Sequence, residues 1–286
     1  MKWKLSIVDN VNQMKTRIFP ESNYKAIWYK GKTIRIALDS EKPITELEFP
    51  EFYDVKITGW CSGNCTYCYQ DSTRSQKHYD ISQIQEFFGK LNENEKPFQV
   101  ALGGGNPNEH PYFIECLMLF SGMGIVPNYP TNGLGLTKEV LEATKEYCGG
   151  VAITCHRHME KTWKQAIVDC VEQGIMVNLH IMISGEASID YFKEIYEEFK
   201  GKVDYFVLLP YIATGRAKPA TVQTEYLFKY LDKQEQLSDI AFGANFIDDL
   251  EKNQGRFAVS LYPPEILSKY LDLKDMKVYS SSFAVV

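Results

Sequence analysis

Three cysteines fall within eight residues, at Cys61, Cys65 and Cys68, and this spacing constrains the chain more than any other feature. They follow residues 53–60, an alternating apolar run that predicts a buried strand. Three thiolates on one tight loop can hold three corners of a four-iron cluster, which normally takes four cysteines. No fourth cysteine lies nearby in the sequence. One iron would therefore remain open to a ligand that is not protein.

The order of these residues, C-x3-C-x-aromatic-C with Tyr67 in the aromatic position, resembles the signature of the radical S-adenosylmethionine (radical SAM) enzymes. The resemblance implies that Cys61, Cys65 and Cys68 are the catalytic and metal-binding residues and hold a four-iron four-sulfur (4Fe-4S) cluster. It also implies that Tyr67 lies at the cofactor and that the open iron chelates S-adenosyl-L-methionine (SAM). An electron from the reduced cluster would cleave SAM and release a deoxyadenosyl radical, which takes a hydrogen atom from the substrate.

A structural zinc site is the alternative interpretation of the same thiols. Zinc would need a fourth ligand from elsewhere, and Cys155 or His156 could supply it. Zinc loops usually carry two C-x2-C pairs, whereas only Cys65 and Cys68 have that spacing here. The spacing and its context therefore favour the iron–sulfur interpretation.

The composition and charge limit the kinds of protein that this chain can be. The chain has 286 residues, 44% of them hydrophobic and 24% charged, which suits one large α/β domain or one domain with a small appendage. A net charge of -6 without a basic block gives no support for nucleic-acid binding. No run of eighteen apolar residues occurs, so we expect a cytoplasmic protein with no membrane partner. Seven cysteines, three of them clustered, do not resemble a disulfide framework.

Strand-like and helix-like segments alternate along the middle of the chain. The expected strands begin at residues 98, 126, 151, 176 and 203, at steps of 28, 25, 25 and 27 residues. This regular repeat is typical of βα units in a parallel sheet. With the cysteine strand there are six units, and the family resemblance implies an α/β fold, a partial (β/α)6 barrel with an open side. A doubly wound flavodoxin-like sheet would give the same alternation, so the repeat alone does not choose between them.

The same pattern divides the chain into three parts. Residues 53–217 form the barrel core. Residues 1–52 precede it as an N-terminal β extension, with a hairpin expected at 24–37 around Lys30-Gly31. Residues 218–286 form a C-terminal α/β extension packed on the barrel, with a helix expected at 224–236 and strand-like segments at 242–246 and 277–286.

In either fold, chemistry belongs at the carboxyl ends of the strands, and the unusual residues collect there. Gly103-Gly104-Gly105-Asn106-Pro107 ends the second strand and resembles the family's G-G-E-P segment, whose backbone holds the methionyl amino group of SAM. Three residues without a side chain let a ligand contact the backbone directly. We therefore predict Gly103, Gly104, Gly105 and Asn106 as cofactor-binding residues. Gly105 and Asn106 stand where the family usually has glutamate.

Polar residues also follow the next strands. Thr131-Asn132-Gly133 resembles the family's T-N-G segment, and we predict that Asn132 lines the site. Thr154, His156 and Arg157 follow the fourth strand, where the family often holds the ribose or carboxylate of SAM. Thr154 suits a ribose hydroxyl and Arg157 a carboxylate, whereas His156 suits a cofactor contact or a substrate-side acid or base. The alternative is that these are solvated loop residues.

The fifth strand places Asn178 and His180 on one face, expected to be the barrel interior. We predict Asn178 as a cofactor-binding residue. His180 taken alone is predicted to be a core histidine whose hydrogen bonds are satisfied.

The sixth strand closes with the sequence LLPYIATGRA at residues 208–217. It resembles a segment, L-P-x-x-x-x-G-R-A, of radical SAM enzymes that modify peptides and proteins. There the backbone after the sixth strand lies against adenine, which implies that Leu209 and Pro210 contact the cofactor. No cysteine follows Cys170, where many peptide-modifying relatives carry auxiliary clusters, so we expect a single cluster and a redox-neutral outcome such as epimerisation.

We therefore predict a radical SAM enzyme, nearest to the peptide- and protein-modifying branch of the superfamily, with SAM and one 4Fe-4S cluster as cofactors. Its expected partners are a small-molecule or peptide substrate and a reducing protein such as flavodoxin or ferredoxin. Two other classes stay open. One is an iron–sulfur or SAM-binding protein without turnover, for which the missing glutamate is the hint. The other is a zinc-stabilised interaction protein.

Overall fold

The computed structural model describes residues 13–220, 222–234, 237–252 and 263–284. Its main element is a nine-stranded sheet with the order β10-β9-β8-β7-β6-β5-β4-β11-β12. Neighbouring strands are parallel except for the pair β11 and β12. The strands are β4 (Phe52–Thr58), β5 (Gln99–Gly104), β6 (Val126–Thr131), β7 (Val151–Thr154), β8 (Val177–Ile183), β9 (Tyr205–Pro210), β10 (Ile240–Phe242), β11 (Ser268–Asp272) and β12 (Lys277–Tyr279).

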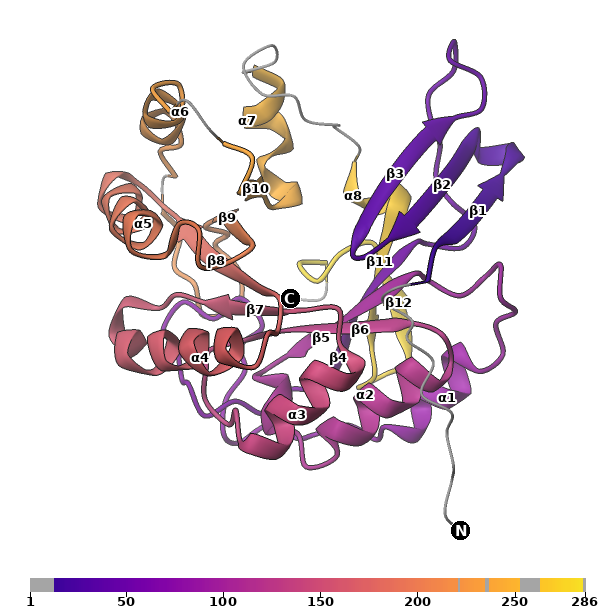
Figure 1. The fold of residues 1–286 in the computed structure, drawn as a ribbon, viewed down its shortest axis with the longest axis horizontal. Coiled ribbons are helices and arrows are strands. Elements are labelled where there is room, and N and C mark those ends of the chain that lie inside the picture. The colour runs from indigo at the N-terminus through magenta and orange to yellow at the C-terminus, as the bar shows by residue number, and fades with distance from the viewer. Residues whose placement is uncertain (1–12, 221, 235–236, 253–262, 285–286) are drawn as a thin grey trace.

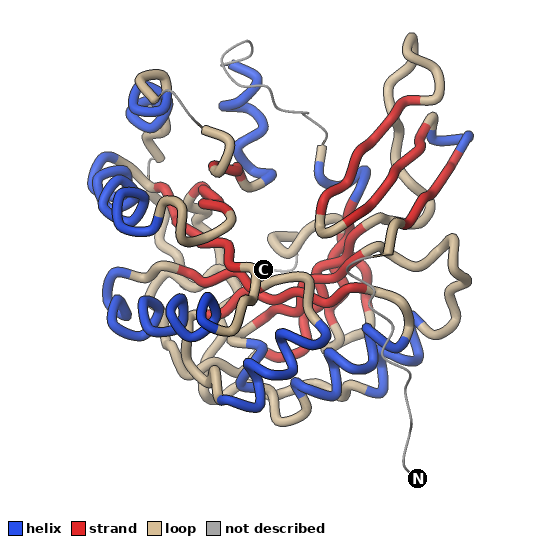
Figure 2. Tube along the Cα trace, in the orientation of Figure 1, coloured by secondary structure: helices blue, strands red, loops and turns tan. Residues whose placement is uncertain are grey.

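Helices join the parallel strands and cover one side of the sheet. Figure 1 shows α1 to α5 on the outer, convex side of the curved strands, and Figure 2 shows the same separation of helices from strands by colour. A doubly wound sheet carries helices on both faces. The predicted partial barrel with an open side is therefore confirmed, and the flavodoxin-like alternative is wrong. The five helices are α1 (Ser82–Phe88), α2 (Phe113–Gly122), α3 (Lys138–Tyr147), α4 (Glu160–Glu172) and α5 (Glu186–Phe199).

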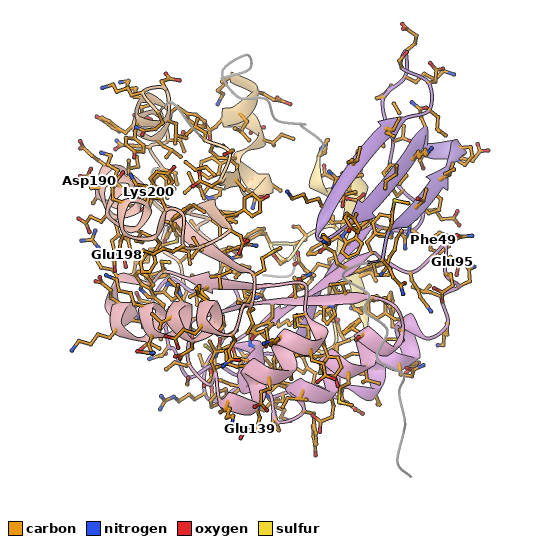
Figure 3. All side chains as sticks on the ribbon, in the orientation of Figure 1. Phe49, Glu95, Glu139, Asp190, Glu198 and Lys200 are labelled. Carbon is orange, nitrogen blue, oxygen red and sulfur yellow. The ribbon has the colours of Figure 1, made fainter. Side chains whose placement is uncertain are left out.

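The core lies between the sheet and these helices. Along β8, buried and half-buried residues alternate, so one face of the strand meets the helices and the other faces the interior of the curved sheet. Leu179 of β8 and Phe192 of α5 are fully buried in this core. Each such side chain contributes about 1.5–3 kcal/mol of hydrophobic stabilisation. Asp190 and Glu198 of α5, and Lys200 directly after it, are exposed and are labelled beside this helix in Figure 3.

The segment before the main sheet forms a separate three-stranded antiparallel sheet of β1 (Lys15–Phe19), β2 (Tyr24–Tyr29) and β3 (Lys32–Ala37). The hairpin expected at 24–37 is confirmed. Lys30 and Gly31 form its turn with φ angles of 49° and 75°, and two successive positive φ angles are typical of a two-residue type I′ turn.

The part of the chain after residue 217 extends the main sheet at both edges. The helix expected at 224–236 is α6, which spans Glu225–Leu231, while residues 235–236 lie outside the described residues. The strand expected at 242–246 is shifted, because β10 ends at Phe242 and a short 3-10 helix follows. Only 277–279 of the segment expected at 277–286 is a strand, and 285–286 are not described. The remaining elements are η1 (Pro20–Ser22), η2 (Pro107–Glu109), η3 (Arg157–Met159), η4 (Ala244–Phe246), α7 (Ile247–Lys252) and α8 (Pro264–Leu267).

The strand β11 joins the edge of the sheet beside β4 and brings a buried ion pair with it. Asp272 lies opposite Lys56 in the register, and its Oδ2 is 3.2 Å from Lys56 Nζ, with side chains 2% and 9% exposed. We expect Asp272→Asn to lower the free energy of unfolding by about 3–5 kcal/mol, because it leaves a buried ammonium without a counter-charge. Urea denaturation would measure this.

The exposed pair of Lys200 and Glu197 is the matched control for that prediction. Its two side chains are 51% and 62% exposed, with 2.6 Å between Lys200 Nζ and Glu197 Oε2. Glu197→Gln should change the free energy of unfolding by less than about 1 kcal/mol, because exposed pairs are screened by water. Equal losses in the two variants would show that burial of the Lys56–Asp272 pair has no special role.

Candidate active site

The cysteine loop follows the carboxyl end of β4, and its last residues pair with its first residues. Cys61 N donates to Thr73 O at 3.2 Å, and Thr73 N donates to Gly59 O at 3.3 Å, so the two ends of the loop are joined. Inside it, Cys68 N donates to Cys65 O at 3.3 Å, which closes a turn around the second and third cysteines. All three cysteines are partly buried and free of disulfides.

Backbone N–H groups of the loop point at two of the sulfurs. Gly63 N lies 3.4 Å from Cys61 Sγ, and Ser72 N lies 3.4 Å from Cys68 Sγ. Such donors stabilise a thiolate relative to a thiol, and the thiolate is the form that binds metal. The loop backbone is therefore suited to two thiolate ligands.

Side chains from two other loops reach the sulfurs. Asn132 Nδ2 lies 3.9 Å from Cys61 Sγ, and His158 Nε2 lies 3.9 Å from Cys65 Sγ. The first contact brings Asn132 to the cysteine loop, while its role at the cofactor stays a prediction. With the backbone donors, each of the three sulfurs has a nitrogen within hydrogen-bond distance.

Electrostatics in the metal-free loop oppose three thiolates at once. Burial raises the pKa of Cys61, and burial together with the neighbouring Cys61 and Cys68 sulfurs raises the pKa of Cys65 to about 11. The positive charge of Arg216 acts in the opposite direction on Cys65. Three partly buried anions need cationic compensation, and metal binding to thiolates provides it and releases the protons. The donor set fits an iron cluster on this ground.

Arg216 holds the cysteine loop from the loop after β9. Its Nε and Nη2 donate to Cys65 O at 3.2 and 2.9 Å, and Nη2 also donates to Ser72 O at 2.9 Å. Its Nη1 donates to Asp71 Oδ1 at 2.8 Å, and its backbone N donates to Cys68 O at 3.0 Å. The planar guanidinium thus fixes both halves of the loop. The family resemblance implies that this segment lies beside adenine and gives no sign of its contacts with the cysteine loop.

Glu109 holds the start of the same loop from η2, after β5. Its Oε1 accepts from Ser62 Oγ at 2.6 Å, and its Oε2 accepts from Ser62 N at 3.4 Å. This contact was also missed, because nothing in the local sequence links residues 47 positions apart.

The three glycines at the end of β5 differ in what surrounds them. A Cβ at Gly104, whose φ is +104°, would lie 2.0 Å from Thr58 O, and one at Gly105 would lie 1.9 Å from Trp60 O. Both glycines are thus required by the backbone that leaves β4. At Gly103 nothing lies within 4 Å of an added Cβ, so this position has the open space that a ligand would need. Contact of these glycines with SAM stays a prediction.

We expect Gly105→Ala to lower the free energy of unfolding by about 1–3 kcal/mol, because a methyl group there overlaps a backbone oxygen that cannot move alone. Gly103→Ala is the matched control and should change it by less than about 1 kcal/mol, since the methyl group enters open space. Both values come from urea denaturation. An unchanged free energy of unfolding in Gly105→Ala would contradict the close approach of Gly105 to the Trp60 backbone.

Asn106 is buried, and its amide is used by the loop after β6. Its Oδ1 accepts from Thr131 Oγ1 at 3.0 Å and from Asn132 N at 3.2 Å, and its Nδ2 donates to Leu134 O at 2.9 Å. These partners direct the side chain to the T-N-G segment rather than to the sulfurs. Asn106 therefore positions Asn132, which itself contacts Cys61.

The residues after β7 separate into two groups. His156 Nδ1 lies 3.0 Å from Tyr67 OH, so His156 and Tyr67 both lie at the cysteine loop. Arg157 is exposed and points to α5, where its guanidinium lies 4.4 Å from the centre of the Tyr191 ring and Nη2 is 3.5 Å from Ala187 O. The structure does not bring the Arg157 side chain to the sulfurs.

The inner face of the sheet carries the candidates from β7 to β9. Thr154 pairs with His180 in the register, and Asn178 shares that face, as expected. Burial lowers the pKa of His180 to about 4, so its imidazole is neutral at pH 7. Among the described residues, Asn178 Oδ1 is buried without a hydrogen-bond partner. That His180 is a satisfied core histidine stays a prediction. Leu209 and Pro210 are half-buried at the end of β9.

The zinc alternative depends on Cys155 or His156 as a fourth ligand. Cys155 is buried in the hydrophobic core, and its Sγ donates to Ile153 O at 3.8 Å. His156 binds the Tyr67 hydroxyl instead of a sulfur. In the part of the chain that the structure describes, no three His, Cys, Asp or Glu side chains come close enough together to hold one metal ion. The geometry therefore gives the zinc interpretation no support.

The site is thus an open partial barrel in which loops after β5, β6, β7 and β9 converge on a three-thiol loop after β4. Residues 55–157 match the family model of the Radical SAM superfamily. We identify this part of the chain as a radical SAM domain, which confirms the superfamily inferred from the cysteine spacing.

Solved structures share this fold. Streptococcus suis SuiB bound to precursor peptide SuiA superposes with a TM-score of 0.66 and 14% identity, over 82% of this chain and 60% of SuiB. The protein anSMEcpe with bound AdoMet and Cp18Cys peptide gives a TM-score of 0.59 and 14% identity, over 83% of this chain and 76% of that one. At such identities the likeness concerns the fold alone. No curated protein matches the chain. Among the described helices, none is both long and apolar enough to cross a bilayer.

Proposed function

We propose that this chain is a radical SAM enzyme in which Cys61, Cys65 and Cys68 hold three irons of one 4Fe-4S cluster. When bound, the cluster supplies the electron that cleaves SAM at its open iron, and the resulting deoxyadenosyl radical abstracts hydrogen from an organic substrate. The observation that carries this proposal is the nitrogen atom within hydrogen-bond distance of each of the three sulfurs, which for Cys61 and Cys68 includes a backbone N–H donor. Such donors stabilise the thiolates that iron requires.

Other residues of the protein would shape the cysteine loop and contact SAM and the substrate. Arg216 and Glu109 fix the shape of the cysteine loop, so that the three sulfurs keep their separation. The open space at Gly103 suits the methionyl end of SAM, and the end of β9 at Leu209 and Pro210 suits adenine. Thr154 and Asn178 line the inner face, where ribose and substrate would lie.

A peptide is the proposed substrate class. Two observations support it, the Gly215-Arg216 segment of the sequence and a fold shared with proteins whose structures were solved with peptides, SuiA for SuiB and Cp18Cys for anSMEcpe. The chain spans 60% of SuiB, so substrate and partners are proposals of ours. A flavodoxin or ferredoxin as electron donor and a cytoplasmic location stay predictions.

The test is reconstitution of the protein with iron and sulfide without oxygen, followed by incubation with SAM and dithionite. We expect about four irons and four sulfides per chain, and release of deoxyadenosine and methionine in equal amounts. Binding of SAM without cleavage would favour the protein without turnover instead. Stoichiometric zinc in a colourless protein would refute the proposal.

A further inference from the structure

Three aromatic side chains form a connected group beside Cys65. Tyr67 OH lies 3.0 Å from His156 Nδ1 and 3.4 Å from His158 Nδ1. The other nitrogen of His158, Nε2, lies 3.9 Å from Cys65 Sγ. The two imidazole rings are stacked, with centres 5.6 Å apart and planes 24° apart. A continuous line of polar contacts therefore ends on one cysteine sulfur.

The far end of this line is fixed to the core. The backbone oxygen of His156 accepts from Trp163 Nε1 at 3.1 Å and from Met159 N at 2.8 Å. Trp163 lies in α4 and is fully buried. The turn that carries His156 and His158 is therefore held by the helix behind it.

The direction of the hydrogen bonds follows from the charge on the sulfur. If Tyr67 donated to His156, a neutral His158 would donate to the Tyr67 oxygen through Nδ1 and present an unprotonated Nε2 to Cys65. A lone pair facing a thiolate is unfavourable. In the opposite order, His156 Nδ1–H donates to the Tyr67 oxygen, Tyr67 O–H donates to His158 Nδ1, and His158 Nε2–H points at Cys65 Sγ. This order gives every contact a proton.

We infer that His156, Tyr67 and His158 form a relay of hydrogen bonds that donates an N–H to the Cys65 thiolate and raises the reduction potential of the cluster. The inference rests on the proposed function. A donor to a ligand sulfur stabilises the negative charge that arrives with the electron, and hydrogen bonds to the sulfurs are among the factors that set such potentials. The Tyr67 hydroxyl, predicted from sequence to contact the cofactor, is assigned here to orienting His158.

The experiment compares wild type with three variants, His158→Phe, His158→Gln and Tyr67→Phe, each reconstituted without oxygen. Electron paramagnetic resonance at a series of fixed solution potentials gives the reduced fraction of the cluster. For His158→Phe we expect a more negative midpoint and a reduced fraction about threefold lower at the wild-type midpoint. His158→Gln should stay near wild type because its amide N–H can replace Nε2–H. Tyr67→Phe should shift in the same direction as His158→Phe but less.

The iron content of each variant distinguishes a failure of the relay inference from a failure of the proposed function. Tyr112→Phe, at an exposed tyrosine before α2, is the control and should match wild type in iron and in potential. A His158→Phe protein with full iron and an unchanged midpoint would overturn the inference while leaving the proposed function intact. Equal shifts in His158→Phe and His158→Gln would also overturn it. If His158→Phe fails to load iron, the midpoint of Tyr67→Phe decides. A wild-type protein that takes up no iron would overturn both.

Discussion

Cys65→Ala is expected to lower the yield of deoxyadenosine below about one hundredth of wild type. The variant keeps two of the three thiolates, and two protein ligands do not hold a cluster that already has one open iron. Iron and sulfide per chain, together with deoxyadenosine measured by chromatography after incubation with SAM and dithionite, check this result.

A second cysteine outside the loop provides the control. Cys148→Ala removes a half-buried thiol beside the core, at the end of α3, and should leave iron content and deoxyadenosine yield at wild-type levels. A Cys65→Ala protein that kept its yield would refute the assignment of the three cysteines. Equal losses in both variants would attribute the effect to general damage.

Gly215→Ala is expected to release the cysteine loop and to reduce iron retention by about 10–100-fold. Gly215 has a φ of +61°, and a Cβ there would lie 2.4 Å from Tyr69 O and 2.6 Å from Cys68 O. Both oxygens belong to the backbone of the cysteine loop, so the methyl group can be accommodated only if the loop moves away. The clamp by Arg216, the next residue, would be lost with it.

Gly201→Ala is the control that separates the steric contact at Gly215 from the strain of placing alanine in a left-handed conformation. Gly201 has a similar φ of +73°, yet nothing lies within 4 Å of an added Cβ. Both variants lose about 1–2 kcal/mol from the left-handed conformation, and only Gly215→Ala should lose iron. Thermal unfolding followed by circular dichroism measures the first effect, and iron retained after gel filtration measures the second. Equal iron retention in the two variants would argue against the clamp.

The order of strands and helices was predictable because it depends on local patterns. The expected strand starts at 98, 126, 151, 176 and 203 compare with observed starts at 99, 126, 151, 177 and 205. Strand β11 was not predicted, since Leu267, Tyr270 and Leu271 are spaced as on a helix and Ser268–Asp272 becomes a strand only by pairing with β4. Pairing between distant segments overrides such weak local preferences.

The candidate site was predictable where a local sequence motif marks its residues. Cys61, Cys65 and Cys68 form one local motif, and its spacing together with its resemblance to the family signature predicts their chemistry. Arg216 lies 151 residues after Cys65, and Glu109 lies 47 after Ser62, so a single sequence carries no sign of either contact. The sequence singles out the glycines at the end of β5 as cofactor contacts, which stays a prediction. It does not show that Gly104 and Gly105 are also packed against the backbone of Thr58 and Trp60.

The position of Arg216 bears on how the holoprotein is made. The ribosome must synthesise 151 more residues after Cys65 before that arginine exists, and β9 must pair with β8 before the guanidinium that follows it reaches Cys65 O. Until then the thiols lie on an unrestrained segment. Metal loading is therefore expected late in biogenesis, on a chain that has already folded, so an iron donor would meet a finished scaffold rather than a nascent one.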